Sequence, residues 1–123
     1  MTEAIRSYRD LEAWRQAVHI TKVVYRMSEH FPSDERFGLT SQIRRAAVSI
    51  ASNIAEGWGR GTTQDYARFL RIARGSMYEV ETQGLIALEL GFVEKDKFEY
   101  FEQAIDEAGR VLAGLLRSIE KKL

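Results

Sequence analysis

Apolar side chains recur every three or four residues along this chain, and that spacing restricts the fold more than any other feature. The last segment shows it without a fault, because seven apolar residues alternate spacings of three and four between Phe98 and Ile119. This is the period of one face of an α-helix, whereas a strand alternates every two residues. The pattern predicts a helix over about residues 95–121.

Three earlier segments carry similar stripes and predict helices over about residues 8–30, 40–57 and 63–90. Pro32, the only proline, ends the first of them, and a Gly-x-Gly-x-Gly linker from Gly57 to Gly61 ends the second. Four amphipathic helices with short connections predict an all-α fold, an antiparallel up-down-up-down four-helix bundle that forms a single domain over residues 1–123. The first stripe, which we expect to face the core, consists of Leu11, Trp14, Val18, Thr21, Tyr25 and Ser28.

Side chains that support catalysis or metal binding are scarce in this sequence. The chain has no cysteine, and neither His19 nor His30 has a glutamate three residues before it, so the Glu-x-x-His pairs of di-iron bundles are missing. The glycine-rich linker lacks the Gly-Lys-Ser/Thr ending of a phosphate-binding loop. We therefore expect no metal, no cofactor and no enzymatic activity.

The hydropathy pattern gives no sign of a membrane or of export. No apolar stretch reaches the roughly 18 residues that span a bilayer, and the first residues lack an apolar run of signal-peptide length. We expect a cytoplasmic protein that does not enter a membrane.

Polar residues interrupt the second and third helices at positions where an apolar face is expected. Arg45 and Asn53 lie within about 80° of each other around the second helix, and Glu56 follows Asn53 by about one turn. Such residues either fix the register of two helices, bind a ligand or take part in catalysis, and we prefer the first role. The predicted polar seam comprises Arg44, Arg45, Asn53, Glu56, Glu79 and Glu81.

Charge is unevenly distributed although the net charge is zero. Residues 36–74 hold seven arginines and two acidic residues, whereas residues 75–123 hold six basic and ten acidic residues. Phosphate contacts require cations presented together, so we predict a nucleic-acid-binding face made of Arg60, Arg68, Arg71 and Arg74. The alternative is that these arginines are paired with acidic residues of the last helix, namely Glu99, Glu102, Asp106 and Glu107.

Some apolar residues lie off the main stripes of the first and third helices. A monomeric bundle needs only one buried face on each helix, so a second apolar face predicts a subunit interface and hence a homo-oligomer. The residues concerned are Ile20, Val24, Met27, Leu70, Leu85 and Leu88.

The run from Gln42 to Gly57, QIRRAAVSIASNIAEG, closely resembles the signature of four-helix-bundle proteins encoded in intervening sequences of bacterial 23S rRNA genes. Other segments agree, including DLEAW at residues 10–14, FP at 31–32 and ERFGL at 35–39. The similarity covers about residues 7–120. Ala51 stands where a proline is often found in this family, and alanine suits a helix interior better.

This resemblance implies a bundle that assembles into a ring of five subunits, possesses no established activity and is associated with RNA. It also implies a second possibility, since related proteins serve as nucleic-acid-binding accessory subunits of reverse transcriptases in diversity-generating retroelements. Those relatives are strongly basic, whereas this chain is net neutral. We therefore expect an oligomeric scaffold of the intervening-sequence type, with the retroelement subunit as the alternative.

Overall fold

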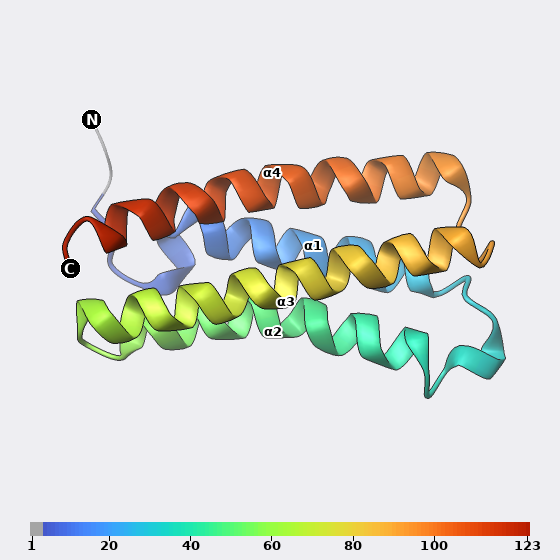
Figure 1. Cartoon of the computed structure of the whole chain (residues 1–123), viewed down its shortest axis with the longest axis horizontal. Coiled ribbons are helices and arrows are strands. Elements are labelled where there is room, and N and C mark those ends of the chain that lie inside the picture. The colour runs from blue at the N-terminus through green and yellow to red at the C-terminus, as the bar shows by residue number, and fades with distance from the viewer. Residues whose placement is uncertain (1–3) are drawn as a thin grey trace.

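The computed structural model describes residues 4–123. Its long helices are α1 (Glu12–Ser28), α2 (Leu39–Gly59), α3 (Thr63–Glu89) and α4 (Lys95–Glu120), with short 3-10 turns η1 (Tyr8–Asp10) and η2 (Ser33–Glu35) before α1 and α2. Successive helices run antiparallel, and α4 packs back against α1, so each helix has two neighbours (Figure 1). The all-α four-helix bundle predicted from the sequence is confirmed.

Local interactions explain where the helices begin and end. Ser7 and Asp10 form a capping box at η1, in which the Ser7 hydroxyl accepts a hydrogen bond from the Arg9 amide at 2.9 Å. Leu11 is extended, so the helix expected over residues 8–30 is divided into η1 and α1. Thr62 caps α3 by accepting a hydrogen bond from the Asp65 amide at 3.1 Å.

The connection between α2 and α3 is shorter than expected. The helix continues through Gly57 and Gly59, and only Gly61, at φ +91°, adopts the left-handed conformation that turns the chain. Gly57 is buried against α3, and a Cβ at this position would lie only 2.7 Å from the Cβ of Phe69. It is therefore a close-packing residue, and its expected role as part of the linker is wrong.

The core uses a face of α1 other than the expected one. Ile20, Val24 and Met27, which we expected at a subunit interface, are buried inside the bundle. The expected core residues Trp14 and Val18 are only half-buried, and Tyr25 is 42% exposed. Helix α1 does carry two apolar faces, but their predicted roles are wrong for these residues, whereas Leu11 and Ser28 of the expected core stripe are buried.

The closest helix contacts depend on small residues. α2 and α3 are the most extensively packed pair, and Ala46, Ala47, Gly57 and Ala73 are among the buried residues of these two helices. On the other side of α3, Gly84 faces the ring of Phe101 on α4. Small side chains let the helix backbones approach, which fixes how α3 lies against both of its neighbours.

Candidate nucleic-acid interface

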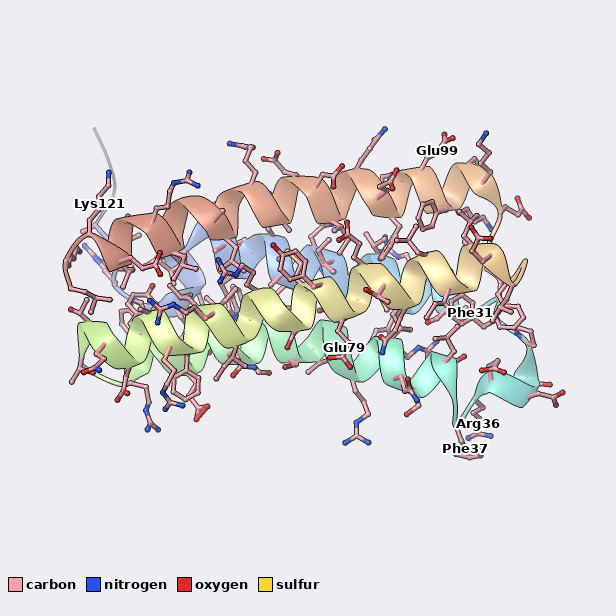
Figure 2. The ribbon with its side chains drawn as sticks, viewed as in Figure 1. Phe31, Arg36, Phe37, Glu79, Glu99 and Lys121 are labelled. Carbon is pink, nitrogen blue, oxygen red and sulfur yellow. The ribbon has the colours of Figure 1, made fainter. Side chains whose placement is uncertain are left out.

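Charge in the folded chain is separated along the long axis of the bundle. One half, here called the basic half, contains residues 4–15, 56–74 and 117–122, with ten basic and five acidic residues. The other, the acidic half, contains residues 22–45 and 79–107, with seven basic and twelve acidic residues. Figure 2 shows Lys121 at the first end and Glu99 at the second. The net charges are therefore +5 and −5.

Two of the four predicted arginines form a cluster at the α2–α3 turn. Arg60 and Arg68 each lie 3.8 Å from a carboxylate oxygen of Asp65, and both guanidinium groups lie over the ring of Phe69, at 5.1 and 4.7 Å from its centroid. One carboxylate shared by two exposed arginines leaves a net positive charge. Such exposed pairs contribute little free energy, so a phosphate can displace them.

Arg71 and Arg74 lie on the side of α3 that faces α4. Arg71 is held by Glu120, with its Nη2 at 2.7 Å and its Nε at 3.2 Å from one carboxylate oxygen. Arg74 is exposed, and no carboxylate oxygen of residues 4–123 lies within 4.0 Å of it. The structure thus places Arg60 and Arg68 together at the α2–α3 turn, and Arg71 and Arg74 on the side of α3 that faces α4. Of the four, Arg74 is the one without an ion pair within residues 4–123.

The alternative interpretation pairs these arginines with Glu99, Glu102, Asp106 and Glu107 of α4. The structure contains different ion pairs. Among the described ion pairs, Arg71 contacts Glu120, whereas Glu107 binds Arg110 of its own helix at 2.6 Å. Glu99, Glu102 and Asp106 all belong to the acidic half, away from the α3 arginines. The alternative interpretation is therefore wrong for these four acidic residues, because the antiparallel register sets the start of α3 beside the end of α4.

Sequence reasoning missed the contribution of α4 to the basic half. Gly109 faces Met77 and Arg71 binds Glu120, so the intervening residues of α4, up to Arg117, lie opposite Arg74. Lys121 and Lys122 follow at the same end. They lie in the acidic last third of the sequence, and only the antiparallel order of the helices reveals them as neighbours of the α3 arginines.

Two groups in the basic half have shifted pKa values. Hydrogen bonds from the backbone amides of Arg6 and Ser7 hold the pKa of Asp10 below its usual value. Burial raises the pKa of Tyr66 to about 12. Asp10 is therefore ionised and Tyr66 neutral at physiological pH, and neither group changes the charge of this half near pH 7.

The centre of the α2–α3 contact is a short hydrogen-bond chain. The hydroxyl oxygens of Ser49 and Ser76 lie 2.9 Å apart across the two helices. The Asn53 amide donates to the Ser49 hydroxyl at 2.9 Å and to the Ser49 carbonyl at 2.8 Å. The two serines, not predicted as seam residues, therefore connect the helices, and Asn53 acts through Ser49.

The other predicted seam residues do not belong to this hydrogen-bond chain, although Arg45 and Glu79 line a surface pocket together with Ser49. Arg44 faces α1, where it donates to the Ser28 hydroxyl at 2.8 Å and covers the Tyr25 ring at 4.6 Å. Arg45 and Glu79 line a surface pocket of about 460 Å³ between α2 and α3. Glu56 is exposed and Glu81 half-buried.

The two histidines are dispersed along the surface. His19 is exposed on α1 and packs edge-on against Tyr100 of α4, with ring centroids 6.3 Å apart, and His30 is exposed beyond the end of α1. Within residues 4–123, no group of three His, Cys, Asp or Glu side chains is arranged to hold a metal ion. None of the helices described here is both long and apolar enough to cross a membrane.

The second apolar face of α1 borders a groove against α2, here called the α1–α2 groove. Its volume is about 370 Å³, and Lys22 is the charged residue that lines it. The remaining lining residues are Tyr8, Trp14, Val18, Thr21, Val48, Ala51, Ser52 and Ala55. This groove, rather than Ile20, Val24 and Met27, is the apolar surface that α1 leaves outside the core.

The fold and the charge arrangement define a small four-helix-bundle protein with one basic half. Its sequence matches the model of the family described as 23S rRNA-intervening sequence protein over residues 9–114, and the chain belongs to this family. That match includes the QIRRAAVSIASNIAEG run and confirms the resemblance.

A solved structure shares the fold at low sequence identity. It is a protein of unknown function from the S23 ribosomal protein family of Bacteroides thetaiotaomicron VPI-5482, which superimposes with a TM-score of 0.78 at 17% identity. The alignment covers 85% of this chain and 95% of that one. A comparison with curated proteins finds no match.

Proposed function

We propose that this chain is a cytoplasmic, non-enzymatic, homo-oligomeric scaffold whose basic half binds RNA. The observation that carries the proposal is the separation of charge along the bundle, which gathers ten basic side chains against five acidic ones at one end. Polyanions bind such a cluster by releasing counterions, in proportion to the number of phosphates neutralised. Membership of the 23S rRNA-intervening sequence family supports RNA as the polyanion.

In the proposed oligomer, several copies of the basic half come together. The α1–α2 groove supplies an exposed apolar surface, and such surfaces commonly mark contacts between proteins. The family resemblance favours a ring of five copies, which would combine the four predicted arginines of each subunit into about twenty. In a cyclic ring every basic half lies on the same side, so weak phosphate contacts add up through multivalency. Light scattering should give a mass several times the 14.1 kDa of one chain, and a monomer would refute the assembly.

The RNA proposal is tested by the salt dependence of binding. Fluorescent single-stranded RNA is titrated with the protein at several salt concentrations, beside an Arg68→Ala/Arg74→Ala variant. Each lost phosphate contact should reduce the log–log slope by about 0.7, so the double variant should lose roughly 1.4 for each subunit that contacts the RNA. The matched control is Lys95→Ala/Lys97→Ala, which removes the same charge from the acidic half and should leave the slope unchanged.

A third variant uses the ion pair between Arg71 and Glu120. Glu120→Gln removes the carboxylate that holds the Arg71 guanidinium at 2.7 Å, so Arg71 becomes free to contact phosphate. Its slope should therefore steepen by about 0.7 relative to the wild type. Absence of binding at low salt, or equal slopes for the basic-half and acidic-half double variants, would reject the basic half as an RNA site.

The accessory-subunit role in a retroelement shares this basic half and predicts the same salt dependence. Its further requirement is binding to a reverse transcriptase. The zero net charge of the chain favours the scaffold over this alternative, because the retroelement relatives are strongly basic.

A further inference from the structure

Phe37 has an environment that is unusual for a phenylalanine. It lies in the connection between α1 and α2, directly after η2, and 87% of its surface is exposed, more than for any other large apolar residue described. The Arg36 guanidinium lies 5.3 Å from the centroid of its ring. Figure 2 shows Phe37 and Arg36 at the tip of this connection, projecting away from the helices.

An exposed phenylalanine forgoes the free energy that its burial would provide. Burying such a side chain contributes about 1.5–3 kcal/mol in general, so a ring held out in solvent by a short, turn-rich connection is a suitable anchor for another protein. The backbone around it is ordered, because Gly38 donates a hydrogen bond to the Glu35 carbonyl at 3.0 Å and Leu39 donates to the Glu35 carboxylate at 3.0 Å. The side chain is therefore presented in a defined place.

We propose that Phe37 of one copy inserts into the α1–α2 groove of a second copy. This inference rests on the proposed homo-oligomer and names the surface that builds it. Ala51, Ser52 and Ala55 give the groove a floor of small side chains, while Trp14 and Val18 supply an apolar wall. A single aromatic ring fits a groove with that composition.

Charge complementarity supports a second copy as the occupant. Asp34, Glu35 and Arg36 precede Phe37 in the same connection, two acidic residues and one basic residue, and the charged residue that lines the groove is Lys22. Insertion of Phe37 therefore brings a segment of net negative charge towards a lysine. Because the anchor and the groove are different surfaces of one chain, the contact is heterologous, and repetition of such a contact closes a ring when the rotation allows it.

The geometry also constrains the orientation of neighbouring subunits. Leu39, at the start of α2 beside Phe37, and Val48, at the near end of the groove, are nine residues apart, or ~14 Å along the helix. A neighbour cannot lie level and parallel while the ring occupies the groove. Neighbours in a closed ring are related by rotation alone and cannot be staggered, so adjacent bundles must be inclined to one another.

The first test measures assembly by light scattering over a dilution series. Phe37→Ala should raise the concentration at which the oligomer dissociates by roughly tenfold to a hundredfold, as expected when a buried phenylalanine is lost from an interface. Tyr78→Ala is the matched control, since Tyr78 is an exposed aromatic on α3, 61% exposed, and should leave dissociation unchanged. Both changes are on the surface, and circular dichroism verifies that both variants remain helical.

The second test uses the absence of cysteine from the native chain. A Phe37→Cys protein and a Ser52→Cys protein are mixed under mild oxidation, and disulfide-linked dimers are measured on a non-reducing gel. The mixture should form a heterologous dimer well above the amount formed by either protein alone. A mixture of Tyr78→Cys with Ser52→Cys should not.

The outcomes separate this inference from the proposed function. An oligomer that persists in Phe37→Ala at every dilution, with no crosslinking above the Tyr78→Cys control, overturns the anchor and leaves the homo-oligomer standing. A monomeric wild-type protein overturns both. Weakened assembly in Phe37→Ala together with the selective crosslink supports both.

Discussion

The contact between Gly84 of α3 and Phe101 of α4 gives a quantitative test of the helix packing. A Cβ at Gly84 would overlap the Phe101 ring at Cε2 and lie 2.7 Å from its Cζ. Phe101 is only 1% exposed and also packs against Phe98, with ring centroids 5.7 Å apart. The ring therefore has no free space to enter, and Gly84→Ala must push α3 and α4 apart or distort Phe101.

Two opposing effects determine how far Gly84→Ala changes the free energy of unfolding. Overpacking a well-packed core costs about 1–3 kcal/mol, whereas replacing a glycine by alanine within a helix contributes about 1 kcal/mol of stability. Gly84→Ala should therefore reduce the free energy of unfolding by up to about 2 kcal/mol. Gly75 on the same helix isolates the second term, because no atom lies within 4 Å of a Cβ built there and the residue is exposed. Gly75→Ala should raise the free energy of unfolding by about 0.5–1 kcal/mol.

Urea unfolding followed by circular dichroism measures both variants. The protein concentration is held constant, because the proposed assembly would make apparent stability depend on it. The difference between the two variants cancels the helix-propensity term and should equal the overpacking cost of about 1–3 kcal/mol. Equal stabilities, within about 0.5 kcal/mol, would refute the close approach of α3 and α4 at this position.

Two further predictions concern local interactions. Asn53→Ala removes two hydrogen bonds to Ser49 and should lower the free energy of unfolding by about 1 kcal/mol, whereas Glu56→Gln on the exposed face should change it little; thermal melts compare the two. Asp10 has a lowered pKa in the folded chain, so its contribution to stability is present above its ordinary pKa of 3.8 and is lost as the pH falls through the lower folded value. The melting temperatures of wild type and Asp10→Asn should therefore differ at neutral pH and converge below that range.

The periodicity of the sequence predicted the helices well, because a bundle buries one stripe of each helix. It failed to identify the buried stripe of α1, because Trp14, Val18 and Tyr25 repeat at the same spacing as Ile20 and Val24. The aromatic stripe also contains Thr21 and Ser28, so it is the less apolar of the two. Ala13 and Ala17 are buried with Ile20, and their small side chains let α1 approach the core closely.

The candidate site was predictable as a basic segment but not as a surface. Counting charges along the sequence identified the α3 arginines, yet their partners depend on the register between α3 and α4. That register pairs Arg71 with Glu120 and leaves Arg74 opposite the end of α4 near Arg117. No pattern within one helix specifies which residue of the next lies opposite, because side-chain packing between the two sets it.

The separation of charge explains how a chain with no net charge can bind a polyanion. In an antiparallel bundle the helix dipoles oppose one another, so the polarity arises from side chains alone. α3 has 27 residues and is ~40 Å long, whereas the screening length at physiological ionic strength is about 8 Å. A phosphate at the outer end of the basic half is therefore largely screened from the acidic half and responds mainly to the nearby positive charge. The acidic half repels the same backbone if it approaches from the other end, so the two halves together favour one end of the chain for the proposed contact with RNA.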